Sequence, residues 1–312
     1  MSLRPGKRRS GARAAAGPQA GPGRAMVLGA TGGIGRAFVE QLAAEGHELL
    51  VVARNRQRLE ELARQVHATY GVVVEALAAD LALDVDLRHV EDRVRGDARL
   101  EVLVNAAGLA SWGRFRELDM ERELDIIRVN VIAAVRLTKA GLSTMLPRRQ
   151  GAIINVASLA GYVMLPFCAT YGGTKAFLIS FTEALHEELR GTGVRIQVVC
   201  PGFTRTDLFT RSGASTAKMP SFIWVRPETI ARSSLAALKH DRAVCIPDAR
   251  FRVLSVLLRL TPRSVVRRVA SRLFGDFTTY RLDDHDSPRG EPRDSTAVPS
   301  PAAKRAPETR GQ

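Results

Sequence analysis

Short apolar runs alternate with amphipathic segments along residues 24–247. The apolar runs are rich in Val, Ile and Leu and are bounded by glycine or polar residues, which is typical of buried parallel strands. In the intervening segments apolar residues recur every three or four positions, as they do on the inner face of a helix. This alternation predicts a single α/β domain with a doubly wound, mostly parallel sheet and right-handed crossovers.

The flanking segments have a different composition. Residues 1–23 and 284–312 are rich in Pro, Gly, Ala, Ser and charged residues, and we expect a disordered basic arm and a disordered tail. Residues 248–276 instead predict a helical extension of two basic amphipathic helices, separated by Thr261 and Pro262. Three roles stay open for this extension: contact with an anionic membrane surface, packing against a second subunit, or cover over a cleft of the domain.

The net charge of +14 is concentrated at two places. Residues 1–24 contribute six positive charges and residues 249–274 contribute seven, with no acidic residue in either segment. The rest of the chain is therefore almost neutral. Such a distribution does not suit a broad phosphate-tracking face, so we expect no specific nucleic-acid partner.

The positions of the cysteines and histidines bear on whether the protein has disulfides or a metal site. The three cysteines, Cys168, Cys200 and Cys245, lie far apart, and the six histidines are scattered, which predicts neither a disulfide framework nor a metal site. The sequence has no apolar run of about 18 residues and its start lacks the apolar core of a signal peptide. We expect a cytoplasmic protein, with peripheral membrane contact through residues 249–274 as one option.

Glycines mark the turn after the first apolar run, in the spacing Gly29-x-x-x-Gly33-x-Gly35. They allow a tight strand-to-helix turn and a close approach of the backbone to a pyrophosphate at the helix N-terminus. This arrangement is typical of a Rossmann fold that binds a dinucleotide.

The second apolar run ends without the acidic residue that usually contacts the adenosine ribose of NAD. Arg54, Arg56 and Arg58 follow it instead, and a guanidinium at this point can pair with a 2′-phosphate. We therefore expect NADP(H) rather than NAD(H). Periodicity places Arg56 and Arg58 on the solvated face of the next helix, which leaves Arg54 as the predicted contact.

Candidate chemistry lies between residues 155 and 177. Tyr171 and Lys175 are four residues apart in a predicted helix, so their side chains share one face. An ammonium near a phenol is expected to lower the phenol's pKa and to make it a usable proton donor and acceptor. Ser158 follows the buried run 152–157 and offers a hydroxyl to the same reacting oxygen. The structural alternative is a tyrosine packed beside a solvated lysine.

These motifs, in this order, resemble the short-chain dehydrogenase/reductase family over residues 24–247. The resemblance implies catalysis by Ser158, Tyr171, Lys175 and Asn130, the last holding a water that links Lys175 to solvent; a structural amide is the alternative role for Asn130. It also implies adenine contacts at Asp80, where a helix-flanking aspartate is an equal alternative. The implied cofactor-binding residues are Gly29, Gly33, Ile34, Gly35, Arg54, Asp80, Leu81, Asn105, Ala106, Gly108, Tyr171, Lys175, Pro201, Gly202 and Thr206.

The reaction implied by the resemblance is reversible hydride transfer between NADP(H) and a carbonyl or secondary alcohol, with Tyr171 as general acid/base. The expected pocket segments are 109–112, 162–167 and a lid within 203–226, and they are mostly apolar. We therefore expect a hydrophobic substrate such as a fatty or steroid-like ketone, and a homo-oligomeric enzyme. The alternative is a noncatalytic cofactor-binding or membrane-surface scaffold protein on the same fold.

Overall fold

The computed structural model describes residues 22–163, 165–206, 208, 212 and 220–275. All of them belong to one compact unit. The predicted arm, apart from its last two residues, the predicted tail and part of the predicted lid lie outside the described residues.

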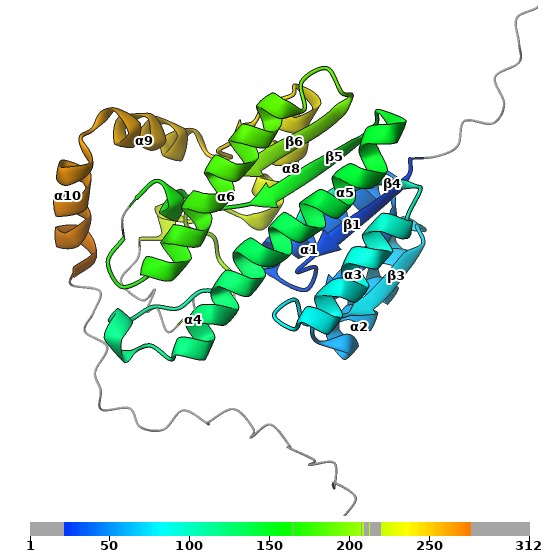
Figure 1. Ribbon diagram of the computed structural model, residues 1–312, viewed down its shortest axis with the longest axis horizontal. Helices are drawn as coiled ribbons and strands as arrows, with labels where there is room; N and C mark the ends of the chain where they lie inside the picture. Colours follow the sequence, from blue (N-terminus) through cyan, green and yellow to red (C-terminus); the bar gives the residue numbers. More distant parts are fainter. Residues whose placement is uncertain (1–21, 164, 207, 209–211, 213–219, 276–312) are drawn as a thin grey trace, which may run out of the picture. The chain divides into compact units, whose positions relative to one another are not determined.

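A parallel sheet of seven strands forms the centre of the domain, in the order β3-β2-β1-β4-β5-β6-β7 (Figure 1). The strands are β1 (Arg24–Leu28), β2 (Glu48–Ala53), β3 (Val74–Ala78), β4 (Leu100–Asn105), β5 (Gly151–Val156), β6 (Val194–Val199) and β7 (Val244–Cys245). Strand order reverses between β1 and β4, where a doubly wound sheet opens a crevice at the carboxyl ends of its strands. The predicted fold class is confirmed.

Helices cover both faces of this sheet (Figure 1). One face carries α1 (Gly33–Ala44), α2 (Arg56–Tyr70) and α8 (Pro227–Lys239); the other carries α3 (Asp84–Gly96), α5 (Ala134–Arg148) and α6 (Ala169–Glu188). Neighbouring residues of a strand point to opposite faces, so Val27 packs in the first core and Met26 in the second. Both faces are apolar, which explains the continuous apolar runs of the sequence.

The sequence between about Met120 and Met145 predicts one long helix, but the structure interrupts it. Instead α4 (Met120–Ile127) leads through a π-helical segment (Arg128–Ala133) into α5. Asn130 lies in the π-helical segment, 1% exposed. Insertions of this kind occur often at functional sites, and here the wider turn accommodates a buried amide that bonds outside its own helix.

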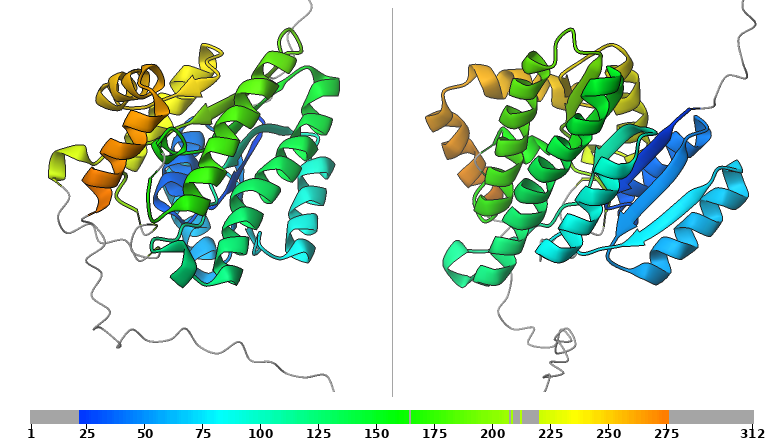
Figure 2. Two further views of the ribbon diagram at one scale, coloured as in Figure 1. Left: turned by 60° about the vertical axis from the view of Figure 1, so that its left-hand side comes forward. Right: turned by 45° about the vertical axis from the view of Figure 1, so that its right-hand side comes forward.

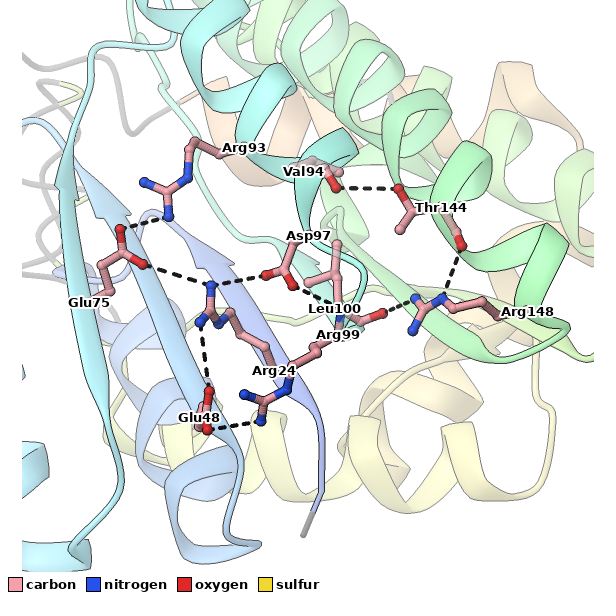
Figure 3. Close-up of polar contacts among 10 residues, drawn as sticks. All are labelled: Arg24, Glu48, Glu75, Arg93, Val94, Asp97, Arg99, Leu100, Thr144 and Arg148. Carbon is pink, nitrogen blue, oxygen red and sulfur yellow. Dashed lines mark hydrogen bonds and ion pairs between the residues drawn. The ribbon is translucent and has the colours of Figure 1, made fainter. Parts of the chain in front are cut away.

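Arg24 belongs to the domain rather than to the basic arm with which its charge was counted. It starts β1, and its guanidinium lies 3.2 Å from Asp97, 3.7 Å from Glu48 and 3.8 Å from Glu75 (Figure 3). Arg93 also pairs with Glu75, at 2.6 Å. This network ties together the amino ends of three neighbouring strands, at the edge of the sheet opposite the crevice.

The helical extension consists of α9 (Ala249–Leu260) and α10 (Arg263–Gly275), as predicted (Figures 1 and 2, orange). The break falls at Thr261 and Pro262, and the Thr261 hydroxyl donates back to the carbonyl of Leu257 in α9 at 2.7 Å. Within the described part of the chain, no helix combines the length and the apolar character that crossing a bilayer requires.

Candidate active site

Glycines bring the backbone of the first turn against its neighbours. Gly29 follows β1 with a φ of +72°, and a Cβ added there would lie 2.7 Å from the backbone of Ala107. A Cβ on Gly35, in the first turn of α1, would lie 2.1 Å from the carbonyl oxygen of Gly29. Only glycine fits at both positions, so α1 begins directly beneath the strand end, as a pyrophosphate-binding turn requires.

A groove of about 520 Å³ lies beside this turn. It has room and donors for a dinucleotide's adenosine half: glycine backbone, guanidinium groups and small side chains. The predicted cofactor residues that line it are Gly29, Arg54, Asp80, Leu81, Ala106 and Gly108. Gly33, Ile34 and Gly35 form the start of α1, and the Thr206 methyl would lie 2.8 Å from a Cβ on Gly33.

Two arginines, not one, line the groove. Arg54 is joined there by Arg58, and neither guanidinium group makes a hydrogen bond or ion pair with a described residue. Arg56 turns away and lies 3.9 Å from Glu60. Arg58 is exposed, as periodicity predicted, but it also lines the groove, so the choice of Arg54 as the single predicted contact left it out. Asn55 gives the reason, because its side chain caps α2 by accepting from the Arg58 N–H at 2.8 Å, which places Arg58 in the first turn, next to the strand ends.

The side chains of Asn105 and Asp80 both make hydrogen bonds within the protein. The amide of Asn105 is 7% exposed and donates to Asn155 at 2.7 Å and to Thr138 at 3.3 Å, inside the sheet rather than in the groove. Asp80 lines the groove and also accepts from the N–H of Ala82 at 3.0 Å. The structural reading of Asp80 is therefore confirmed, while contact of Asp80 with adenine and direct cofactor contact by Asn105 stay predictions.

Ser158, Tyr171 and Lys175 converge at the carboxyl end of β5. Ser158 immediately precedes a short 3-10 turn, Leu159–Gly161, and its hydroxyl accepts from the N–H of Ala160 at 3.1 Å. It also hydrogen-bonds the Tyr171 side chain. Lys175 is 4% exposed and donates to the carbonyl of Val156 at 2.9 Å. Its ammonium lies 5.6 Å from the centre of the Tyr171 ring.

Burial dominates the electrostatics of this cluster. It raises the pKa of Tyr171 to about 12, although the hydrogen bond from Ser158 acts in the opposite direction. The same burial lowers the pKa of Lys175 to about 8, because the ammonium is removed from water. The expectation that Lys175 lowers the pKa of Tyr171 below its ordinary value was therefore wrong for the protein alone. The four-residue spacing does bring Tyr171 and Lys175 together, but spacing does not indicate how deeply the two side chains are buried.

Asn130 binds protein on both sides of its amide. Its carbonyl oxygen accepts from the N–H of Leu109 at 2.9 Å, and its amino group donates to the Leu109 carbonyl and to the Thr174 hydroxyl, both at 3.0 Å. A Cβ on Gly108 would lie 3.5 Å from both the Asn130 oxygen and the Lys175 ammonium. Asn130 thus fixes the 108–109 turn against α6, while its water-holding role stays a prediction.

A second cavity, of about 440 Å³, opens beside Ser158 and Tyr171. Parts of all three predicted pocket segments line it, at 110–112, at 163 and 165, and at 203, 208 and 212, together with Pro201 and Gly202. Its opposite wall comes from apolar residues of α9 and α10, which the sequence did not assign to a partner: Phe251, Leu254, Leu257, Leu258, Val265, Val266, Val269 and Ala270. The helical extension therefore covers the cleft.

Comparison with known proteins agrees with this geometry. The short chain dehydrogenase family model matches residues 24–217, more than half of the chain. A very-long-chain 3-oxoacyl-CoA reductase of Anas platyrhynchos is 29% identical over 87% of this chain and 87% of its own length. The protein of the same name from Phaeosphaeria nodorum is 33% identical over 69% of this chain, but only 62% of its length is matched.

Among solved structures, a short-chain dehydrogenase from Sphingobium yanoikuyae in complex with NADPH is 32% identical, with a TM-score of 0.70. The match covers 84% of this chain and 99% of that one. The family model extends past Lys175, and the fold matches nearly the whole length of the Sphingobium yanoikuyae protein. This chain therefore belongs to the short-chain dehydrogenase/reductase family and is an oxidoreductase of CH–OH or keto groups.

Proposed function

We propose that this enzyme uses NADP(H) to interconvert a carbonyl and a secondary alcohol on a long-chain acyl substrate, with Tyr171 as general acid/base. The observation that carries the proposal is the 440 Å³ cavity, which has Ser158 and Tyr171 on one wall and no charged side chain among the described residues that line it. Such a cavity favours an apolar substrate and presents two hydroxyl groups to a single polar atom.

Bound NADPH would supply the hydride. The protein's part is to position the carbonyl and move a proton: Ser158 and Tyr171 both donate to the carbonyl oxygen, and Tyr171 transfers its proton as negative charge develops there. Its raised pKa keeps the phenol protonated at neutral pH, which suits the reductive direction. The ammonium of Lys175 then stabilises the phenolate that remains.

The proposed preference for NADP(H) rests on Arg54 and Arg58. Two guanidinium groups without partners among the described residues, at the end of β2, suit a 2′-phosphate, and no acidic residue follows this strand before Glu60. The NADPH complex of the Sphingobium yanoikuyae relative supports this choice.

For the substrate class we propose a long-chain 3-oxoacyl thioester. The curated relatives are named very-long-chain 3-oxoacyl-CoA reductases, and the apolar wall from α9 and α10 suits an alkyl chain. A steroid-like ketone is the competing apolar substrate, and a noncatalytic cofactor-binding protein is the alternative of another class.

The test is to titrate the purified protein with NADPH and NADH, and then to follow NADPH absorbance with 3-oxoacyl thioesters and with steroid ketones. We expect tighter binding of NADPH and turnover of the thioesters. Tyr171→Phe should keep NADPH binding and lower kcat by about 10²–10⁴-fold. Turnover retained by this variant would reject Tyr171 as the acid/base, and the absence of turnover with every ketone would favour the noncatalytic alternative.

We further propose that the outer side of α9 contacts an anionic lipid surface. Val253, Val256 and Leu260 are 63%, 52% and 78% exposed, and residues 249–274 contain seven arginines and no acid. Apolar and cationic side chains together suit the interface of an anionic bilayer. The wild type should sediment with phosphatidylglycerol vesicles and V253S/V256S/L260S should not; a soluble dimer that this variant dissociates would instead assign the face to the predicted homo-oligomer.

A further inference from the structure

We propose that Arg263 and Arg267 of α10 bind the phosphate-bearing head group of the thioester substrate, in a chamber that adjoins the apolar cavity. The inference rests on the proposed 3-oxoacyl thioester function and adds a site for the polar end of the substrate. The ligand chemistry is a phosphate carried on a pantetheine arm, as in coenzyme A.

The chamber has a volume of about 800 Å³. The first turns of α6 and the segment before them form one wall, and α10 forms the other. Figures 1 and 2 show where these two helices lie. It shares seven lining residues with the 440 Å³ cavity, among them Val163, Leu258 and Val266. A substrate whose reacting carbonyl lies at Tyr171 can therefore extend across this shared wall into the chamber.

Charge distinguishes the two spaces. Arg263 and Arg267 are the only charged residues among the described residues that line either one, and no acid lines them. They are one helical turn apart, so their side chains lie on the same face of α10, together with Ser271, which also lines the chamber. The uncharged remainder suits a neutral arm, whereas the two guanidinium groups suit phosphate.

Both arginines are also available. They are exposed, and neither guanidinium group makes an ion pair or hydrogen bond within the described part of the chain. By contrast, Arg136 on α5 is held by Asp84 at 2.6 Å and by Glu91 at 2.5 Å. Guanidinium groups bind phosphate through paired, charge-assisted hydrogen bonds, so two free ones in a cavity are suited to a phosphate or diphosphate.

The experiment compares R263A/R267A with R268A/R272A, which removes two exposed arginines of the same helix that line neither cavity. Activity is measured without lipid, on a 3-oxoacyl-CoA and on the matching N-acetylcysteamine thioester, which has no phosphate. For R263A/R267A we expect KM for the CoA thioester to rise about tenfold or more, with KM for the truncated thioester and both kcat values within about twofold of wild type. R268A/R272A should match wild type on both substrates.

Direct binding separates this site from the proposed reaction. Coenzyme A is titrated by calorimetry at saturating NADPH, so that the adenosine groove is filled, and R263A/R267A should weaken its binding about tenfold or more. No saturable binding to wild type, or equal affinity for wild type and R263A/R267A, would overturn the site even if thioesters are reduced. Saturable binding sensitive to R263A/R267A without turnover of any thioester would support the site and reject the proposed reaction.

Vesicles provide the last distinction, because lipid head groups also carry phosphate. If R263A/R267A and R268A/R272A weaken binding to phosphatidylglycerol vesicles equally, and neither changes KM for the CoA thioester, the arginines serve the lipid surface and the proposal is wrong. A KM effect confined to R263A/R267A supports the head-group site.

Discussion

Replacing Lys175 by methionine should stabilise the protein at neutral pH while it abolishes turnover. Lys175 is 4% exposed, and burial lowers its pKa from 10.5 to about 8. Methionine has a similar length and no charge, so it fills the same space without the cost of removing an ammonium from water. The residue proposed to stabilise the Tyr171 phenolate is thus expected to reduce the stability of the fold.

The magnitude follows from proton linkage. The folded protein releases this proton near pH 8 and the unfolded chain near pH 10.5, so the unfolded state binds more protons in between and stability rises with pH across this window. At pH 7 the full difference applies and costs the wild type about 3 kcal/mol. Loss of the bond to the Val156 carbonyl, at 2.9 Å, offsets about 1–2 kcal/mol. A net stabilisation of about 1–2 kcal/mol remains.

Urea unfolding of wild type and Lys175→Met at pH 7 and pH 9.5 measures this effect. The free-energy difference should move against the variant by about 2 kcal/mol between the two pH values, because the wild type loses most of its penalty. Lys139→Met is the matched control, since Lys139 is exposed on α5, and its difference from wild type should not change with pH. A Lys175→Met variant less stable than wild type at pH 7, or a pH-independent gap, would refute the reasoning.

Three other variants test the cofactor turn, the groove beside it and the sheet edge. Gly35→Ala puts a Cβ 2.1 Å from the carbonyl oxygen of Gly29, and we expect NADPH binding to be lost in fluorescence titration, with about 1–3 kcal/mol of destabilisation; normal affinity would contradict the close approach. R54E/R58E should raise Kd for NADPH at least tenfold and spare NADH, whereas equal weakening would reject 2′-phosphate recognition. Arg24→Met leaves three carboxylates without their shared partner and should cost about 1–3 kcal/mol in urea unfolding, less at high salt; an unchanged midpoint would show that the network adds nothing.

The fold could be predicted because both faces of the sheet are buried. A strand covered on both sides needs an uninterrupted apolar run, so β5 was located to within a residue of its bounds, at 152–157. The break between α4 and α5 was not predicted. It depends on the bonds that Asn130 makes to Leu109, 21 residues away, and periodicity within the helix does not contain that contact.

The site could be predicted where chemistry depends on spacing, and not where it depends on surroundings. The four-residue interval brings Tyr171 and Lys175 to one face of α6, whatever surrounds them. Their pKa values depend on burial by segments distant in the chain, so the direction of the shift at Tyr171 was predicted wrongly. The position of Arg58 beside the groove had a local signal that was overlooked. Asn55, three residues before it, is the N-cap of α2 and places Arg58 in the first turn of that helix.

For the helical extension, too, the sequence predicted the helices but not what their apolar face contacts. Its amphipathic pattern predicted two helices and an apolar face, but an apolar face suits a cleft, a subunit or a bilayer equally well. The ring of Phe251 decides for the cleft, because it lies where a Cβ on Gly202 would be, within 2.3 Å. Because Gly202 has no side chain, the turn after β6 leaves room for the Phe251 ring, and α9 packs there. For this reason, α9 and α10 form a wall of the substrate cavity rather than an independent appendage.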